Sequence, residues 1–287
     1  MKKKACKTLA AASAFAMVLT LLPAGSAQAA AIYLPTRSVT YKKLNGKWVK
    51  NQSEKISCNK KGLRKLVTGT SYAPDGSKSG SDTKSVYTYS GRKLRSFLFY
   101  NGSSYSSETY KYDKKGRLVK AGTADPANYT TYKYKGKSKK PVSSTSYYGE
   151  MKLNSIKYSY KKNTEIRSIT YGGGKAKETF YFNKNRKLIK WISSFPDDKS
   201  TTIYKYDKKG NVIKQTKKST YGTVITKTSY KYYKKKFIRQ KITKQTSYDQ
   251  KGQVIDTWAY KTVYSGFKKY KVKAARVSWS PDPAGEN

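Results

Sequence analysis

The sequence predicts an all-β fold, an elongated antiparallel meander of tandem hairpins in a single twisted or coiled sheet. Two observations lead to this prediction. A Tyr-rich phrase recurs every 22–26 residues, and a fixed period in this range is typical of a repeat array. Within each phrase the apolar and polar residues alternate, as they do in a strand with one covered face. No helical spacing of apolar residues interrupts this pattern after Ala31.

The clearest copies of the phrase begin at Tyr110 (Tyr-Lys-Tyr-Asp-Lys-Lys-Gly-Arg-Leu-Val-Lys) and at Tyr204 (Tyr-Lys-Tyr-Asp-Lys-Lys-Gly-Asn-Val-Ile-Lys). The last aromatic residue before the turn is the anchor of each copy. The anchors are Tyr89, Tyr112, Tyr134, Tyr160, Phe182, Tyr206 and Tyr232. With two strands in each copy, we expect every repeat to lengthen the sheet by about 10 Å.

Each phrase contains a tight turn, seen most clearly at Asp113–Gly116 and Asp207–Gly210. The Asp side chain can accept hydrogen bonds from the backbone of the turn, and Gly takes the positive φ that follows a type I turn. This loop predicts that each anchor lies opposite the aliphatic residue six positions later. The expected pairs are Tyr112 with Leu118, Tyr160 with Ile166, Phe182 with Leu188, Tyr206 with Val212, Tyr232 with Ile238 and Tyr248 with Val254, and Tyr110 is expected opposite Lys120.

A second set of turn sequences lies between these loops, for example Asn101-Gly102 and Gly172–Gly174. All connections are therefore short, and short connections join antiparallel neighbours. An open sheet of more than about 10 strands rarely stays flat, so we expect this sheet to twist and curl. The sequence does not determine whether its two edges meet.

Four segments are expected along the chain. Residues 1–29 have the form of a signal peptide, with a basic start, an apolar stretch at Leu9–Leu22 and a cleavage-type Ala27-Gln-Ala29. Residues 30–55 are expected to be a leading segment, 56–276 the hairpin repeat domain and 277–287 a disordered tail. This arrangement predicts a secreted, extracellular protein at or near the cell wall, with no membrane insertion once the signal is removed.

The charge balance is strongly basic. The chain carries 62 Lys and Arg against 16 Asp and Glu. Removal of residues 1–29, which contain four lysines and no acidic residue, leaves a formal net charge of +42. A surface of this charge attracts anionic polymers.

Enzymatic activity is not expected. The chain has no His, the commonest general base and a common metal ligand, so we expect no cofactor and no metal. Cys58 is the one Cys left after signal removal, and it lacks a His partner for nucleophilic chemistry. Asp113, Asp207 and Asp249 are explained by their turns.

Lysines that recur between the aromatic residues form the candidate binding site. Lys111, Lys133, Lys205 and Lys231 each stand beside an anchor, and strand alternation points them to the opposite face of the sheet. We expect them to bind an anionic polysaccharide or a teichoic-acid-like polymer. Extracellular nucleic acid is an alternative partner, and a structural or adhesive surface protein without a specific polyanion ligand is an alternative function.

The phrase resembles the YD-repeat, or Rhs-type, family. The resemblance lies in Tyr112, Asp113, Gly116 and Leu118, in Tyr206, Asp207, Gly210 and Val212, and in Tyr248, Asp249, Gly252 and Val254. It implies a secreted or surface-exposed array of β-hairpins in which these residues are structural. More weakly, the aromatic doublets resemble the aromatic-rich hairpin repeats of cell-wall-binding proteins.

Overall fold

The computed structural model describes residues 29–234 and 237–273, and every regular element in these ranges is a β-strand. The strands are β1 Ala29–Leu34, β2 Arg37–Leu44, β3 Lys47–Cys58, β4 Arg64–Ser71, β5 Thr83–Ser90, β6 Lys93–Asn101, β7 Ser104–Tyr112, β8 Leu118–Thr123, β9 Asn128–Tyr134, β10 Pro141–Tyr148, β11 Met151–Lys161, β12 Thr164–Tyr171, β13 Gly174–Phe182, β14 Leu188–Ser194, β15 Lys199–Tyr206, β16 Val212–Ser219, β17 Gly222–Tyr233, β18 Phe237–Tyr248, β19 Val254–Ser265 and β20 Lys268–Lys273. Within the described ranges, no helix is long and apolar enough to cross a membrane. The expected signal peptide (apart from Ala29) and the expected tail lie outside the described residues.

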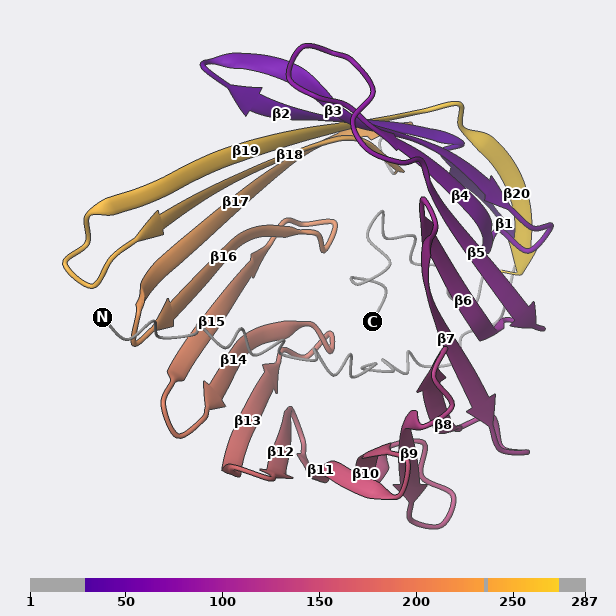
Figure 1. The fold of residues 1–287 in the computed structure, drawn as a ribbon, viewed down its shortest axis with the longest axis vertical. Helices are drawn as coiled ribbons and strands as arrows, with labels where there is room; N and C mark the ends of the chain where they lie inside the picture. Colours follow the sequence, from indigo (N-terminus) through magenta and orange to yellow (C-terminus); the bar gives the residue numbers. More distant parts are fainter. Residues whose placement is uncertain (1–28, 235–236, 274–287) are drawn as a thin grey trace, which may run out of the picture.

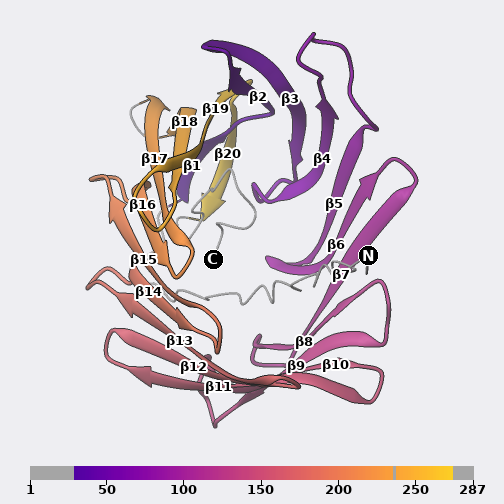
Figure 2. The same ribbon diagram turned by 60° about the vertical axis from the view of Figure 1, so that its left-hand side comes forward.

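Strands β2 to β19 form one closed antiparallel barrel in which consecutive strands are neighbours. Figures 1 and 2 show these strands as a ring. The ring is closed by β19 and β2, which pair from Tyr260 opposite Lys42 to Ser265 opposite Arg37. The hydroxyls of Thr40 and Thr262 lie 3.0 Å apart across this closure.

The prediction of an elongated, single twisted or coiled sheet was therefore wrong, although the all-β antiparallel meander was correct. The open sheet would have left β2 and β19 as exposed edges, and these two strands instead pair with each other. Closure removes both edges, whose unpaired backbone groups would otherwise invite association with another chain. The segment expected to lead the repeats, 30–55, supplies β2 and most of β3 to the barrel wall.

The predicted turns are confirmed. The Asp113 N–H donates to the Arg117 carbonyl at 2.9 Å, and the Gly116 N–H donates to the Asp113 carbonyl at 2.9 Å. The Asp113 carboxylate accepts the Arg117 N–H at 2.9 Å, and Gly116 has φ +77°. The loop from Asp207 repeats this geometry, with φ +89° at Gly210.

Five of the predicted anchor pairs are confirmed. These are Tyr112 with Leu118, Phe182 with Leu188, Tyr206 with Val212, Tyr232 with Ile238 and Tyr248 with Val254. Two other predicted pairs were wrong. Tyr110 lies opposite Ala121 because the register shifts between Lys111 and Tyr112. Tyr160 lies opposite Glu165 because Lys161 pairs with Thr164, which leaves a two-residue turn.

Tyrosine hydroxyls join each hairpin to the one before it. Four tyrosines on the first strand of a hairpin donate to the carbonyl of the first residue in the preceding hairpin's second strand. The bonds are Tyr134 to Leu118 at 2.7 Å, Tyr160 to Pro141 at 2.9 Å, Tyr206 to Leu188 at 2.5 Å and Tyr230 to Val212 at 3.0 Å. We call these bonds the tyrosine latches.

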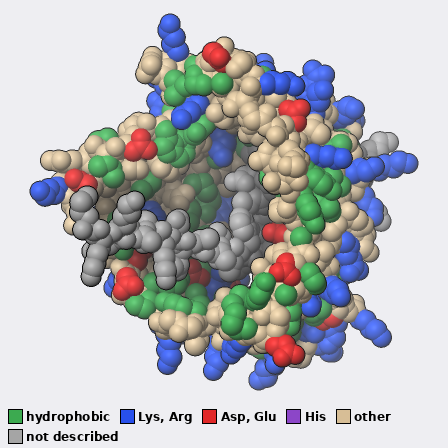
Figure 3. Space-filling model, in the orientation of Figure 1, with side chains coloured by type: hydrophobic (Ala, Val, Ile, Leu, Met, Phe, Trp, Pro, Cys, Tyr) green, Lys and Arg blue, Asp and Glu red, His purple; other side chains and the backbone are tan. Residues whose placement is uncertain are grey.

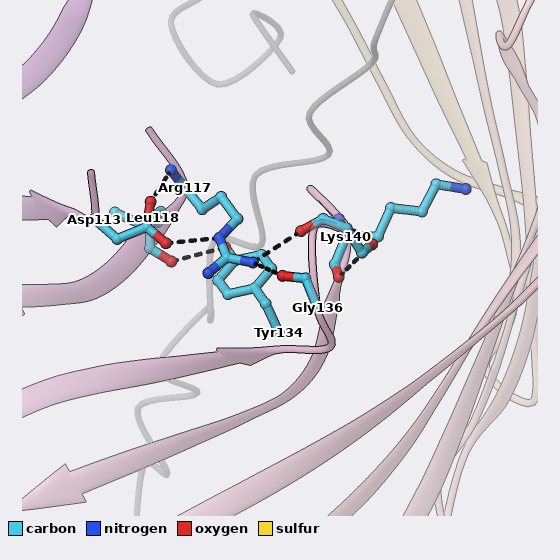
Figure 4. A network of polar contacts seen from close by, with 7 residues as sticks. Asp113, Arg117, Leu118, Tyr134, Gly136 and Lys140 are labelled. Carbon is cyan, nitrogen blue, oxygen red and sulfur yellow. Dashed lines mark hydrogen bonds and ion pairs between the residues drawn. The ribbon is translucent and has the colours of Figure 1, made fainter. Parts of the chain in front are cut away.

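A cation from the preceding hairpin covers the ring of several anchors. The Arg117 guanidinium lies 4.6 Å from the centre of the Tyr134 ring. Figure 4 shows Arg117 between the Asp113 carboxylate, which it meets at 2.6 Å, and the Gly136 carbonyl, to which it donates at 2.9 Å. Equivalent contacts are Lys93 over Tyr112 at 5.5 Å, Lys140 over Tyr160 at 4.7 Å and Lys187 over Tyr206 at 5.4 Å. Such cation–π contacts stabilise the boundaries between hairpins, and those over Tyr134, Tyr160 and Tyr206 lie at boundaries that also have a latch.

The two ends of the described chain form a separate pair. β1 and β20 make a two-stranded sheet in which Ile32 lies opposite Tyr270. The Tyr33 ring lies 6.0 Å from that of Tyr233 and 5.5 Å from that of Phe237, in the β17–β18 hairpin. This pair therefore packs against the barrel beside its closure.

Replacing Gly116 with Val is expected to destabilise the protein by about 1–2 kcal/mol, because a β-branched residue must then adopt a positive φ. Lys115→Val, an exposed position in the same turn, is the matched control. Urea unfolding of both variants measures the difference. Equal stability of the two variants would contradict this account of the turn.

Replacing Tyr206 with Phe removes one latch hydroxyl and keeps the ring. We expect a loss of about 0.5–1.5 kcal/mol in the free energy of unfolding, whereas Tyr221→Phe, at a position that is 69% exposed, should leave it nearly unchanged. Calorimetry on the two variants tests the role of the latch. A Tyr206→Phe protein as stable as the Tyr221→Phe protein would show that the hydroxyl contributes nothing.

Candidate polyanion-binding face

The barrel wall has two faces that differ in chemistry. Side chains alternate between the faces along a strand, and directly opposed residues of neighbouring strands share a face. The register therefore assigns every strand residue to a face. We call the face with the anchors Tyr112, Tyr134, Phe182 and Tyr206 the aromatic face, and the opposite one the lysine face.

The aromatic face is the concave, inner one. In a closed barrel the inner side chains converge and cover one another, whereas the outer ones face solvent. Buried strand side chains such as Phe180 and Arg167 lie on this face by register, whereas Ile203 on the opposite face is 47% exposed. The lysine face is therefore the convex face, and Figure 3 shows Lys and Arg side chains around most of the periphery.

The carboxylates of the described strands all lie on the aromatic face. They are Glu54, Glu108, Glu165, Glu178 and Asp256, assigned by register with their neighbours. Arg167 holds two of them, with its guanidinium 2.8 Å from Glu165 and 3.8 Å from Glu178. Burial raises the pKa of Glu178 above its usual range, against the opposing effect of Arg167. The other acidic residues of the described chain stand in turns and loops, so the strands present no negative side chain on the lysine face.

The four lysines predicted from the sequence all lie on the lysine face and are exposed. They are Lys111 in β7, Lys133 in β9, Lys205 in β15 and Lys231 in β17. The barrel does not bring them together as one ladder, because strands β10–β14 separate the first two from the last two. Each of them instead stands among lysines or polar residues that cross-strand register places beside it.

One set of opposed residues crosses seven strands, from β9 to β15. We call it the mixed row, because lysine alternates in it with serine. Its members, each directly opposite the next, are Lys133, Ser143, Lys157, Ser168, Lys177, Ser194 and Lys199. The four lysines are exposed and recur about every 10 Å, on alternate strands.

A shallow groove lies along part of the mixed row. It has a volume of about 320 Å³ and is lined over β12–β14 by Ser168, Ile169, Thr170, Lys175, Ala176, Lys177 and Ser194. Two ammonium groups and three hydroxyls thus surround one depression. This combination can bind an anion and hydrogen-bond to neighbouring hydroxyls of a polymer.

A second set crosses β15 to β18 and consists of lysine alone. We call it the four-lysine row: Lys205 lies opposite Lys214, Lys214 opposite Lys227, and Lys227 opposite Lys244. Lys205, Lys227 and Lys244 are exposed and Lys214 is half-buried. Opposed side chains on one face start about 5 Å apart, and like charges in such pairs are destabilising.

Sequence reasoning missed most of both rows. Lys157, Lys177 and Lys199 lie outside the repeated phrase, and Lys214, Lys227 and Lys244 become neighbours only through register. One signal was present, because Lys120, Lys190 and Lys214 each follow the two aliphatic residues that close a phrase. The first of those aliphatic residues lies opposite an anchor, and the second has no partner on the neighbouring strand because the register shifts there. The lysine that follows therefore lies on the lysine face.

The described residues contain no group of three or more His, Cys, Asp or Glu side chains that could hold a metal ion. Glu165 and Glu178 both contact the Arg167 guanidinium, which lies between them. Both side chains are at most 15% exposed. Their arrangement is that of a buried ion cluster within the wall.

No family model matches this chain, and no curated protein matches it in sequence. The resemblance to YD repeats therefore stays a prediction. Solved structures similar to this chain include a porin-like protein from Bacteroides uniformis, with 8% identity and TM-score 0.45 over 82% of this chain and 98% of that one. A porin-like protein from Bacteroides vulgatus has 9% identity and TM-score 0.37 over 80% and 98%. TcdB2-TccC3 without its hypervariable C-terminal region has 9% identity and TM-score 0.37 over 82% of this chain and 16% of that one.

The buried tyrosines of the aromatic face predict that the protein becomes less stable to unfolding at alkaline pH. Burial raises the pKa of Tyr206 to about 12, while in the unfolded chain this group ionises near its ordinary value of about 10. The stabilisation from the neutral phenol is therefore complete below about pH 10 and is lost as the pH rises toward 12. We expect the free energy of unfolding to fall more steeply between pH 10 and 12 for the wild type than for Tyr206→Phe. Denaturant titrations across this range measure both slopes, and parallel slopes would contradict the assignment.

Proposed function

We propose that this protein is a secreted, non-enzymatic barrel whose lysine face binds an anionic polymer of the cell envelope or its surroundings. The observation that supports this most is the sorting of charge between the two faces. The carboxylates of the described strands all lie on the aromatic face, and most of their lysines lie on the lysine face, with exceptions such as Lys42, Lys217 and Lys241. A surface that served only solubility could mix both signs, and mixed signs would also remove the repulsion between neighbouring lysines.

The chemistry of the rows suits a polymer better than a small ligand. The mixed row repeats one unit, a lysine and a serine, across seven strands. A repeating ligand can meet such units one after another, with its anionic groups on the ammonium groups and its hydroxyls on serine. A teichoic-acid-like polymer or an acidic polysaccharide provides both kinds of group.

The same rows favour an aqueous location for the lysine face. A lysine that faces hydrocarbon costs about 2–4 kcal/mol near the middle of a bilayer. Exposed lysine recurs on β9, β11 and β13 and on each strand from β15 to β18. We therefore propose that the barrel works in the extracellular space, with this face in water or against its anionic partner.

Binding should depend steeply on salt, because each ammonium that meets an anionic group releases a counterion. We expect the quadruple variant Lys111→Gln, Lys133→Gln, Lys205→Gln and Lys231→Gln to reduce the slope of log affinity against log salt by about 1 for each lysine that binds an anionic group in the wild type. The matched control removes the same charge from exposed turn positions, with Lys60→Gln, Lys114→Gln, Lys208→Gln and Lys251→Gln. Titrations with purified poly(glycerol phosphate) teichoic acid, polygalacturonate and single-stranded DNA compare the candidate partners.

An unchanged slope in a folded quadruple variant would contradict binding through the lysine face. If the salt slope fell equally in the quadruple variant and in its turn control, net charge alone would govern binding. Tightest binding to DNA would replace the envelope polymer with extracellular nucleic acid. A wild-type protein that binds none of the three polymers would favour a structural or adhesive role.

A further inference from the structure

The four-lysine row differs from the rest of the lysine face in the density of its charge. In the mixed row a serine separates successive lysines, so the charges stand about two strands, or 10 Å, apart. In the four-lysine row Lys214 has a lysine directly opposite it on both sides, Lys205 and Lys227. Its lysine side chains therefore start about one strand spacing, or 5 Å, apart.

No negative side chain offsets this density on the same face of the described strands. The carboxylate closest in sequence, Asp207, is turned to the loop and to the next hairpin, where it accepts from Asn211 and from the Tyr232 hydroxyl at 2.6 Å. Asp256 in β19 lies opposite Ser247, on the aromatic face. The repulsion between the four ammonium groups is thus uncompensated within the described strands.

The neighbours of the row have no rings for stacking. A parallel row on the same face consists of Ile203, Thr216, Ile225 and Thr246, each directly opposite the next. Ile203 is 47% exposed. The two threonine hydroxyls add hydrogen-bond donors beside the ammonium groups, and the aromatic surface that proteins use to stack nucleic-acid bases is missing from both rows.

From this geometry we infer that the four-lysine row is a binding site for closely spaced phosphate groups, such as those of a linear phosphate chain. The inference rests on the proposed function and specifies the ligand for one part of the same face. Lysine acts as a point charge with three donors, and a phosphate group has several anionic oxygens that two ammonium groups about 5 Å apart can share. A polyuronate carries one carboxylate on each sugar ring, and successive rings turn about the chain axis, so the carboxylates on one side of the chain stand farther apart than these lysines.

The test uses two quadruple variants that remove equal charge from the same face. The row variant combines Lys205→Gln, Lys214→Gln, Lys227→Gln and Lys244→Gln. Its control, in the mixed row, combines Lys133→Gln, Lys157→Gln, Lys177→Gln and Lys199→Gln. The full-length mature protein is titrated with inorganic polyphosphate, with polygalacturonate, and with vesicles that contain phosphatidylglycerol, each over a series of salt concentrations.

We expect the salt slope with polyphosphate to fall by about 3–4 in the row variant and by less than about 1 in the mixed-row variant. With polygalacturonate the slopes of the two variants should fall by similar amounts. Tripolyphosphate should also raise the melting temperature of the wild type and of the mixed-row variant more than that of the row variant. This second readout keeps the comparison valid if the row variant differs in stability.

Selective loss of polyphosphate binding in the row variant would support the phosphate site with a free chain as its source. The same selective loss on vesicles, with weak binding to free polyphosphate, would support it with a lipid headgroup as the source. If the salt slopes with polyphosphate and with polygalacturonate fell equally in the row variant and in the mixed-row variant, the phosphate site would be overturned and the proposed function would stand. If both variants bound every probe as tightly as the wild type, both the site and the proposed function would be overturned.

Discussion

The tyrosine latch is the interaction on which the rest of this structure depends. A hydroxyl from one hairpin reaches the carbonyl that opens the second strand of the hairpin before it, as Tyr134 does to Leu118 and Tyr206 to Leu188. The same tyrosine is covered by a cation from that earlier hairpin, for example Arg117 over Tyr134. Each hairpin thus binds its neighbours through a repeated set of bonds, which is how repeat proteins build a continuous structure from units that are unstable alone. Aliphatic residues are few, and these polar and aromatic interactions take over part of the role of a thick apolar core.

The latches also explain why the two faces of the wall differ. The aromatic face needs hydroxyls, rings and the cations that cover them, and it bends inward. On this face the positive charge of Arg167 is paired with the carboxylates of Glu165 and Glu178. Carboxylates on this face serve the ion clusters and hydrogen bonds of the wall, as Glu54 does for Ser38. The lysines of the mixed row and of the four-lysine row have no carboxylate beside them on the same face of the described strands. The composition of these rows is therefore free to follow what lies outside the barrel.

The sequence predicted what depends on local chemistry and missed what depends on distant pairing. The loop from Asp113 to Gly116 and the pairing of Tyr112 with Leu118 follow from turn geometry within a few residues, and both were correct. Closure was not predicted because β2 lacks the repeated phrase, so nothing in it indicated a partner more than 200 residues away. The anchor phrases placed Lys205 on the correct face, but its neighbour Lys214 depends on the extra residue Ile213, which shifts the register between Lys205 and Tyr206. A one-residue shift of this kind moves side chains between faces, and only the paired strands reveal it.

Closure of the barrel removes the simplest structural reason for lysine along the strands. Lysine on an edge strand prevents pairing with another chain, but every strand from β2 to β19 is paired on both sides. Lys214 lies between two lysines in the middle of the wall, where it protects no edge and where like charges reduce stability. An anionic ligand reverses the sign of this contribution, because each group that it places between two ammonium ions adds two attractions at shorter distance, which outweigh the repulsion. The proposed function accounts for these lysines by making the lysine face one side of an interface, with the barrel as the scaffold that keeps its rows in register.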